Sequence, residues 1–418
     1  MKSGEDPTIA VDDGSRAARY RRVARMWLLV YLASALAVAV QRTLFSPENN
    51  FLILRTSSRH LIAGQDLYAA YPGIYQDFFK YSPTFAFLWA PFAWLPPVPG
   101  YMLWAVACVS ALYAGITRAL PPRQAVVALA LSWLAVFGDL QRSQSNALCA
   151  GLMILAWAWL ERGYQWRPAM AIAAATFVKL FPVAAVVTAV FHRRRARFAA
   201  VFAAVIVVGI ALPLLVTPPA TLAMQYRSWF RIESRDAIPL PRYGTGGADL
   251  YAGLMGQFRV WWGVRWPNWP AQLGGVLVLL APLAVRRAWW ARAQFRVLFL
   301  ASLLVFCVLF NHQAESPSYS IAIIGASVWF AASERTWWRV GLIAACIIIV
   351  NVASTDLMPR TWYRQWYVPY LVKTIPLIPL WIVMQLELLG VVPSAGASER
   401  AKAGEGEVAA PEALAEAR

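Results

Sequence analysis

The sequence predicts an all-α protein that crosses a membrane many times. Its 418 residues are 60% hydrophobic and only 14% charged, and a soluble domain of this size could not bury so much apolar surface. Apolar runs long enough to cross about 30 Å of hydrocarbon as helices recur along the whole chain. Lys and Arg gather in the short links between these runs. Together these three features predict a polytopic membrane protein with about 12 transmembrane helices.

A membrane domain is predicted to fill residues 26–390. It follows a cytoplasmic tail at residues 1–25 and precedes a second cytoplasmic tail at residues 391–418, which is rich in Ala, Glu and Gly and is expected to be disordered. Threading the chain through its basic links places both ends in the cytoplasm. The predicted spans lie near residues 26–45, 83–97, 101–118, 124–139, 146–161, 169–190, 198–217, 271–285, 296–311, 318–332, 338–354 and 368–388.

The net charge of +17 does not indicate a nucleic-acid partner, because the arginines cluster where apolar runs end. Clusters at residues 16–25, 193–197 and 286–296 are typical of links that stay in the cytoplasm. No small-residue cleavage site follows the basic start, so the first span is expected to be an uncleaved anchor in a bacterial inner (cytoplasmic) membrane. The cysteines all lie in apolar runs and are expected to be core residues: Cys108, Cys149, Cys307 and Cys346.

Three polar stretches fall on the outer face along this path: residues 46–82, residues 218–270, and the shorter pair 311–318 and 354–368. The link from Gln141 to Asn146 can be re-entrant or lie on either side of the membrane. The first stretch is too long for a simple connection, and its residues Phe51 to His60 predict a short amphipathic helix in the interface. The aromatic residues that follow predict a belt at the membrane rim: Tyr68, Tyr71, Tyr75, Phe78 and Phe79.

Asp66, in Gly64-Gln65-Asp66-Leu67-Tyr68, is the leading candidate for a general base. A carboxylate on a short loop against an apolar wall can reach the attacking hydroxyl of an acceptor at about 2.6–3.2 Å. The alternative role is structural, in which the Asp66 side chain caps the turn that follows it. The other carboxylates expected at the outer face are Asp77, Glu233, Asp236, Asp249, Glu315 and Asp356.

His312 is the second candidate for chemistry. It ends an apolar span and lies among polar residues, namely Asn311, Gln313, Glu315 and Ser316. Such a cluster at the membrane rim suits a sugar or a phosphate better than lipid. The alternative is a structural histidine at a helix end. The two remaining histidines, His60 and His192, are expected to be solvated surface groups.

Lys179 lies in the apolar run Phe177-Val178-Lys179-Leu180-Phe181-Pro182, where a cation costs at least about 2.5–3.5 kcal/mol. We expect it to bind the phosphate of a lipid-linked substrate. It could instead snorkel to the interface or pair with Glu387. The outer stretch at residues 218–270 carries six arginines, including Arg242, against three acids, and this excess also favours an anionic ligand.

Signatures of soluble nucleotide-using and metal-using enzymes are missing from the sequence. It contains no P-loop, no dinucleotide fingerprint, no zinc-binding pair of His on a helix and no Asp-x-Asp motif. A nucleotide-sugar donor taken from the cytoplasm is therefore not expected. A sugar donor carried by a lipid and handled within the membrane is the natural substitute.

Short motifs recur in a characteristic order along the chain: Gly64-Gln65-Asp66-Leu67-Tyr68, Phe79-Lys80-Tyr81-Ser82-Pro83, Pro91-Phe92-Ala93-Trp94-Leu95-Pro96, Gln144-Ser145-Asn146, Lys179-Leu180-Phe181-Pro182, and His312 with Ser316-Pro317. At these residues the chain resembles glycosyltransferase family 87, a family of integral membrane enzymes in the GT-C superfamily. Its members include polyprenol-phosphate-mannose-dependent mannosyltransferases. The resemblance covers most of residues 26–390.

The resemblance implies a GT-C-type fold and inverting transfer of a hexosyl unit, mannosyl in the first place, from a polyprenyl phosphate to a lipid or glycan acceptor on the extracytoplasmic face. By this match Asp66 is the general base, and His312 assists at the donor phosphate or sugar. No metal or other cofactor is expected, since positioning and fixed cations can stabilise the departing phosphate. The residues expected to bind substrate are Gln65, Tyr68, Lys80, Tyr81, Gln144, Asn146, Lys179, Arg242, Asp249, Asn311, Glu315 and Ser316.

Two other classes of membrane protein share some of these features. A transporter or flippase of lipid-linked or polyanionic substrates would also have many spans and an intramembrane Lys179. Against it, the halves of the sequence show no internal repeat, and the polar residues gather at outer loops. A structural subunit of an envelope-assembly complex would leave Asp66 and His312 without chemistry. Replacing either residue would stop turnover in an enzyme and flux in a transporter, and would change little in a scaffold.

Overall fold

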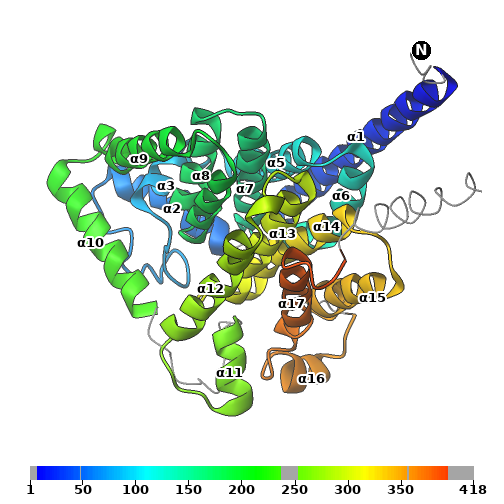
Figure 1. Ribbon diagram of the computed structural model, residues 1–418. Helices are drawn as coiled ribbons and strands as arrows, with labels where there is room; N and C mark the ends of the chain where they lie inside the picture. The colour runs from blue at the N-terminus through cyan, green and yellow to red at the C-terminus, as the bar shows by residue number, and fades with distance from the viewer. Residues whose placement is uncertain (1–6, 48, 237–252, 355–356, 394–418) are drawn as a thin grey trace, which may run out of the picture.

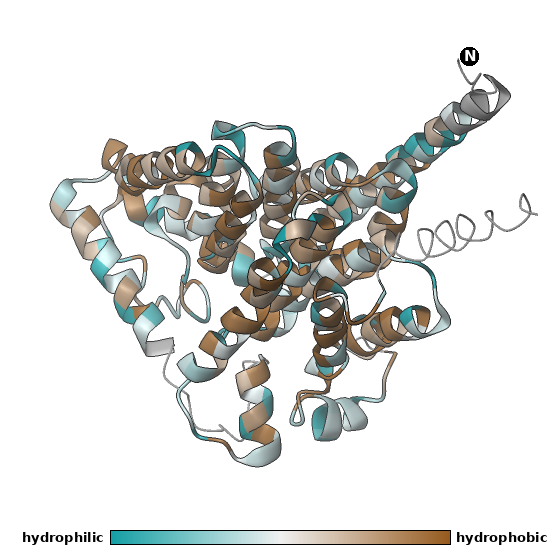
Figure 2. Ribbon diagram, in the orientation of Figure 1, coloured by the Kyte–Doolittle hydropathy of each residue, from teal (hydrophilic) through white to brown (hydrophobic). Residues whose placement is uncertain are grey.

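The computed structural model describes residues 7–47, 49–236, 253–354 and 357–393 (Figure 1). Across these ranges the chain forms α-, 3-10 and π-helices and no strand, which confirms the predicted all-α class. Hydrophobic helices fill the middle of the molecule in Figure 2, whereas hydrophilic residues gather on connections and on the projecting part of α1 (Pro7–Leu44). This distribution fits helices that pack against one another and against lipid.

The N-terminal half alternates long helices with short ones. Helix α1 begins inside the stretch predicted as a tail, and the predicted spans at 101–118, 124–139 and 146–161 coincide with α5, α6 and α7 to within a few residues. The remaining elements of this half are α2 (Asn49–Ile62), α3 (Pro83–Leu88), α4 (Ala90–Ala93), α5 (Pro97–Ala119), α6 (Pro122–Gln141), α7 (Asn146–Glu161), α8 (Trp166–Val178), the 3-10 helix η1 (Phe181–Phe191), α9 (Arg195–Ala211) and the 3-10 helix η2 (Leu212–Leu215).

In the C-terminal half, regular α-helix gives way repeatedly to short 3-10 and π segments. The predicted span at 368–388 contains an α-helix only from Leu377. The elements are α10 (Pro219–Asp236), α11 (Leu254–Trp262), α12 (Trp269–Val285), η3 (Arg287–Trp289), α13 (Ala293–Leu309), η4 (Ser316–Ser318), α14 (Tyr319–Ala332), α15 (Trp337–Cys346), the π-helix η5 (Ile347–Val352), α16 (Arg360–Trp362), the π-helix η6 (Tyr363–Tyr367), η7 (Val372–Thr374) and α17 (Leu377–Leu388).

Proline interrupts two of the predicted spans. The stretch at 83–97 is not one helix but the short pair α3 and α4, and Pro91 occupies the first turn of α4. The predicted span at 169–190 ends as an α-helix at Val178 and continues, after an extended residue, as η1. The cause is Pro182, whose ring would collide with the carbonyl of Val178 four residues earlier.

The multi-pass character is clear, but the predicted count of about 12 spans is not confirmed. Within the described ranges, four helices are long and apolar enough to cross a membrane, or five if the pair Arg360–Tyr367 and Val372–Leu388, bent by 77°, forms one span. Five further apolar helices in these ranges are only 10–17 residues long. Each of these shorter helices, taken singly, is below the length of about 20 residues that crosses the hydrocarbon core.

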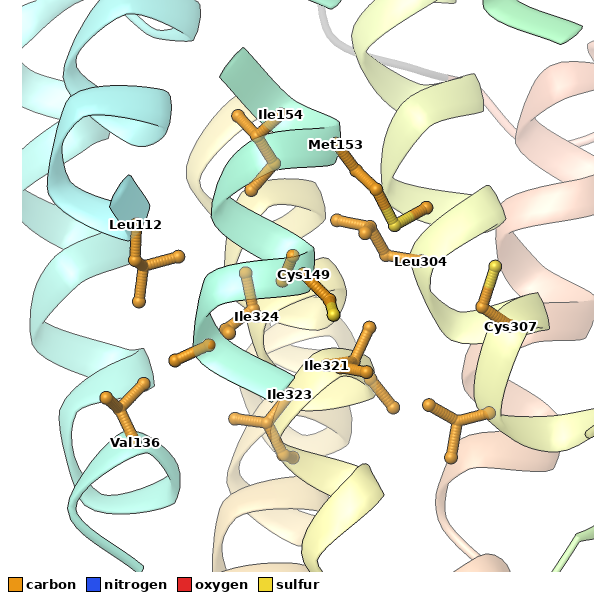
Figure 3. Close-up of a cluster of buried hydrophobic side chains, with 14 of the residues drawn as sticks. Leu112, Val136, Cys149, Met153, Ile154, Leu304, Cys307, Ile321, Ile323 and Ile324 are labelled. Atoms are coloured by element: carbon orange, nitrogen blue, oxygen red, sulfur yellow. The ribbon is translucent and has the colours of Figure 1, made fainter. Parts of the chain in front are cut away.

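The hydrophobic core is built around α7, α13 and α14. Figure 3 shows Cys149 and Met153 of α7 close to Leu304 of α13 and Ile321 of α14. Nearly every residue of α13 and α14 is buried, as expected for helices that are surrounded on all sides. All four cysteines are buried and free, which confirms their prediction as core residues.

Helices α5 and α7 approach each other closely because each has a glycine at the contact. A Cβ atom added to Gly151 would lie 2.5 Å from the backbone nitrogen of Leu112, and one added to Gly115 would lie 2.7 Å from the carbonyl oxygen of Gly151. Small residues allow such close packing between membrane helices. The contact fixes the position of α7, whose first turn reaches the site described below.

A buried ion pair joins α15 to α17. Arg339 Nη2 lies 2.7 Å from Glu387 Oε1, and both side chains are almost completely buried. Trp329 Nε1 donates a hydrogen bond of 2.7 Å to the other carboxylate oxygen. The suggested pairing of Lys179 with Glu387 is therefore wrong, because Arg339 and Trp329 already occupy this carboxylate.

We predict that Glu387→Gln destabilises the protein strongly. The change leaves the buried Arg339 guanidinium without its counter-charge, and breaking a buried pair in this way costs about 3–5 kcal/mol. The measurement is the midpoint of thermal unfolding of the purified protein in detergent. Glu334→Gln is the matched control, since Glu334 is exposed; equal midpoints for the two variants would contradict the prediction.

Candidate functional site

Helix α10 holds the first outer stretch against the membrane domain. In Figure 1 it runs along the flank of the molecule beside the loop that joins α2 to α3. The fully buried Gln225 side chain accepts a hydrogen bond from the backbone nitrogen of Leu67 at 3.0 Å and donates one to the carbonyl of Gln65 at 2.7 Å. Part of the predicted loop at 218–270 is thus a helix whose side chains satisfy the backbone of another loop.

The Asp66 carboxylate is oriented by two hydrogen bonds. Ser228 Oγ donates to one carboxylate oxygen at 3.1 Å, and the backbone nitrogen of Tyr68 donates to the other at 3.1 Å. The bond from the Tyr68 nitrogen is the turn-capping contact that the sequence analysis gives as the alternative role of Asp66. Each carboxylate oxygen can accept a further bond, so capping the turn and accepting a proton are compatible at this half-buried residue.

The aromatic residues after α2 pack inward more than an interfacial belt would. Tyr68, Tyr75 and Phe79 are buried, so the prediction of a belt is wrong for these three. The hydroxyl of Tyr68 donates to the carbonyl of Tyr81 at 2.8 Å, and burial raises the pKa of Tyr68. These contacts fix the loop that carries Asp66 instead of anchoring it in lipid.

Neither of the two histidines predicted as solvated surface groups is one. His60 is buried with its ring centroid 4.1 Å from that of Tyr71, and burial lowers the pKa of His60. The Tyr71 hydroxyl in turn donates to the carbonyl of Asp66 at 2.8 Å. His192 is largely buried beside Glu161, 3.6 Å away. The predicted short helix is present as α2, on which Ser57, Ser58 and His60 are buried and Arg59 is exposed.

A cavity of about 470 Å³ opens where residues of the stretches 46–82, 218–270 and 311–318 meet. Its lining includes polar side chains from several elements: Lys80, Tyr81, Gln144, Lys179, Trp229, Glu233, Gln272, Asn311, His312, Gln313 and Glu315. It also includes apolar side chains from η1, α12, α13 and the residue after α13: Phe181, Val183, Val276, Phe306 and Phe310. A lining of both kinds suits a ligand with a polar head and an apolar chain.

Lys179 stands at the break between α8 and η1. The break leaves the carbonyl of Phe177 to accept a hydrogen bond of 2.6 Å from Ser82 Oγ, which ties the first outer stretch to α8. The Lys179 ammonium donates to Asn146 Oδ1 at 2.6 Å and more weakly to Gln144 Oε1 at 3.4 Å. The lysine therefore faces the cavity from a fixed position and does not snorkel away.

Behind Asn146 lies a carboxylate that sequence reasoning missed. Asp139 of α6 is buried, and its two oxygens accept hydrogen bonds from Asn146 Nδ2 at 2.8 Å and from the backbone nitrogen of Ala147 at 2.9 Å. An acidic residue in an apolar span is itself a signal of function. Asp139 lies at the end of the predicted span at 124–139 and not in a predicted outer stretch, so the criterion of a carboxylate at the outer face does not include it.

His312 borders the cavity at the end of α13. Its Nδ1 lies 3.3 Å from Nε2 of Gln272, which also donates to the carbonyl of Phe310 at 3.2 Å. The Gln272 amide nitrogen is a donor, so it bonds to Nδ1 in the tautomer that carries its proton at Nε2.

The third outer stretch meets α10 beside His312. Gln313 Nε2 donates to Glu233 Oε2 at 3.1 Å, and both residues line the cavity. The backbone of Asn311 packs against Gly253, where an added Cβ would lie 2.6 Å from the Asn311 carbonyl oxygen. The stretches at 46–82, 218–270 and 311–318 therefore converge in space, although they are far apart in sequence.

The residues expected to bind substrate divide into three groups. Those on the cavity wall are Lys80, Tyr81, Gln144, Lys179, Asn311, His312 and Glu315. Four others do not line the cavity: the exposed Gln65, the buried Tyr68 and Asn146, and Ser316. The Ser316 hydroxyl lies 2.9 Å from Lys373 Nζ. Arg242 and Asp249 lie outside the described residues. Asp66 does not line the cavity, although Trp229, next to its partner Ser228, does.

Comparison with known proteins gives one family match. The sequence pattern of Glycosyltransferase family 87 matches residues 78–311. No curated protein matches the chain. Similar solved structures include ArnT from Cupriavidus metallidurans bound to undecaprenyl phosphate, with 15% identity over 87% of this chain and 76% of that one and a TM-score of 0.45. The Archaeoglobus fulgidus oligosaccharyltransferase in the apo form is 11% identical over 84% of this chain and 56% of that one, with a TM-score of 0.39.

We predict that Gln225→Ala loosens the loop around Asp66. The change leaves the buried backbone nitrogen of Leu67 without its acceptor, at a cost of about 1–3 kcal/mol. Proteolytic cleavage between residues 62 and 70 of the purified protein should become faster, and the unfolding midpoint should fall. Gln76→Ala is the matched control because the Gln76 side chain is exposed on the same outer stretch. Equal cleavage rates in both variants would count against the clamp.

Proposed function

The chain belongs to glycosyltransferase family 87, and from this premise we propose that it is an inverting hexosyltransferase that uses a polyprenyl-phosphate sugar. The sugar is mannose, and the acceptor is a lipid or glycan on the extracytoplasmic face of a bacterial inner membrane. Membership of the family makes the chain a glycosyltransferase, and its many apolar helices make it a multi-pass membrane protein. The proposal concerns the sugar donor, the side of the membrane on which transfer takes place, and the residues that carry out the reaction.

The observation that carries this proposal is the cavity lined by both polar and apolar side chains. A polyprenyl-phosphate sugar has an isoprenoid chain, an anionic phosphate and a polyhydroxylated ring. The apolar side chains of Val183, Val276 and Phe310 suit the chain, and the ammonium of Lys179 suits the phosphate. The polar groups of α10 and the third outer stretch can receive sugar hydroxyls. A nucleotide-sugar would leave these apolar side chains without a partner.

The proposed reaction forms one carbon–oxygen bond, breaks another and transfers one proton. The acceptor hydroxyl gives its proton to Asp66 as its oxygen attacks the anomeric carbon, and the carbon–oxygen bond to phosphate breaks with its electron pair on the phosphate. Attack from the opposite face inverts the configuration, so a β-linked mannosyl phosphate gives an α-mannoside. Lys179 and His312 stabilise the charge that grows on the leaving phosphate.

The choice of Asp66 as base competes with three carboxylates on the cavity wall. Asp77, Glu233 and Glu315 all line the cavity. Asp77 is mostly exposed beside Lys80, and Glu233 is hydrogen-bonded to Gln313. Asp66 is favoured because the family resemblance rests on its motif and because Ser228 and Tyr68 hold its orientation. A set of carboxyl-to-amide variants decides among them.

We predict that Asp66→Asn lowers kcat by about 10²–10⁴-fold without unfolding the protein. The assay follows radiolabelled mannose from synthetic polyprenyl-phosphate-mannose into a membrane lipid extract, with purified protein in detergent. Glu233→Gln and Glu315→Gln are run beside it. Transfer that survives Asp66→Asn but is lost in Glu233→Gln would move the base to α10. No transfer from any lipid-linked sugar by folded wild type would favour the transporter.

We propose that the reaction needs no metal, because Lys179 and oriented polar groups provide the stabilising charge. Transfer should therefore be unchanged by millimolar EDTA. The measurement compares the rate before and after chelation and dialysis, and a metalloenzyme in the same buffer serves as the positive control for chelation. Loss of transfer that returns when Mg²⁺ or Mn²⁺ is added would contradict the proposal.

The proposed orientation can be tested with cysteine labelling. All four native cysteines are buried, so a membrane-impermeant maleimide should report on a single introduced thiol. We predict that Gln76→Cys is labelled in intact spheroplasts and that Arg194→Cys is labelled only after the membrane is opened. Both positions are exposed. The reverse pattern would place the cavity on the cytoplasmic side.

A further inference from the structure

We infer that Asp139 is a positioning residue that acts through Asn146 to fix the ammonium group of Lys179 where it receives the donor phosphate. This inference rests on the proposed function, since it names the phosphate of a lipid-linked sugar as the ligand of Lys179. Nothing in the family resemblance or in the predicted substrate-binding set includes Asp139. Three side chains take part: Asp139 of α6, Asn146 at the start of α7 and Lys179 at the end of α8.

The first step is the environment of the carboxylate. Asp139 is buried in α6, and one oxygen accepts from Asn146 Nδ2 at 2.8 Å while the other accepts from Ala147 at 2.9 Å. An ionised carboxylate accepts hydrogen bonds and donates none. The amide group of Asn146 must therefore turn its NH₂ toward Asp139, and its carbonyl oxygen must face the opposite way.

The second step is what the carbonyl oxygen of Asn146 meets. Lys179 Nζ lies 2.6 Å from it, and Asn146 itself is fully buried. Asn146 cannot touch a substrate from this position, so its predicted role as a substrate contact changes to that of a bridge. The bridge links a buried anion to a cation that would be costly to hold in an apolar wall without compensation. Asp139 and Lys179 are also close enough to interact electrostatically.

The third step counts the donors of the lysine. An ammonium group has three N–H donors, and within the described residues Lys179 uses two, toward Asn146 and Gln144. Lys179 lines the cavity, so one donor is left for a ligand oxygen there. Gln144 and Asn146 limit the directions in which this third donor can point. The cation is thus oriented before the phosphate arrives, which lowers the cost of ordering it on binding.

A purely structural role for Asp139 makes a different prediction. Its bond to Ala147 satisfies the first turn of α7, for which the N-cap residue Ser145 provides no side-chain cap. If capping were its whole role, removing the bridge at Asn146 would leave the cap and its effects untouched. Asn146→Ala therefore separates the two roles, because it breaks the path to Lys179 and leaves Asp139 bonded to Ala147.

The test measures KM for the polyprenyl-phosphate sugar, kcat, and direct binding of undecaprenyl phosphate to the purified full-length protein by fluorescence. We expect Asp139→Asn and Asn146→Ala each to raise the donor KM and to weaken undecaprenyl phosphate binding by about tenfold, the size of a lost hydrogen bond to a charged group. In a Lys179→Ala background neither change should weaken binding further, since residues that act through one another are not additive.

The outcomes separate the inference from the proposed function. Two results would overturn the inference even if the wild type transfers sugar. One is that Asn146→Ala binds undecaprenyl phosphate as well as the wild type does. The other is that the losses of binding affinity in these variants add fully to the loss in Lys179→Ala. Weakened binding in both variants, coupled to Lys179, would support it even if the wild type transfers no sugar, and only the proposed reaction would then fail. If Asp139→Asn does not fold, Asn146→Ala decides alone.

Discussion

The break in the polypeptide between α8 and η1 is the constraint on which the site depends. Helix α8 ends at Val178 because an α-helix cannot continue through Pro182. A broken helix inside a membrane must find partners for its freed backbone groups. Ser82 provides one by bonding to the carbonyl of Phe177, which draws the first outer stretch to this point. The same break turns Lys179 out of the helix and toward the amides of the α6–α7 turn.

Helix α10 makes the second connection. Gln225 and Ser228, three residues apart and so on one face of the helix, bond to the stretch that holds Asp66. One turn further on, Glu233 reaches the third outer stretch through Gln313. A single amphipathic helix therefore sets the distance between the candidate base and His312. Loops of this length would otherwise give each residue considerable freedom.

Much of the class and part of the site could be predicted from sequence, because both follow from residues that are unusual where they stand. Lys179 in an apolar run and His312 at a span end were identified, and both lie on one cavity. Asp139 was not identified, because its role depends on a hydrogen bond from Asn146, which lies seven residues later in the sequence and beyond the turn between α6 and α7. The pairing of Glu387 with Arg339, and the burial of His60, depend on how helices pack, which periodicity does not show. The number of spans is not confirmed for a related reason, because proline at positions 91 and 182 divides apolar runs into short helices.

The 3-10 form of η1 has a consequence for depth in the bilayer. Its 11 residues rise about 22 Å at about 2.0 Å per residue, whereas an α-helix of the same length would rise about 16 Å at about 1.5 Å. The basic link at 193–197 follows η1, and Lys179 precedes it. The longer rise per residue therefore moves the lysine about one helical turn further from that link. Under the proposed function, the donor phosphate would be held at the same greater distance from the basic link.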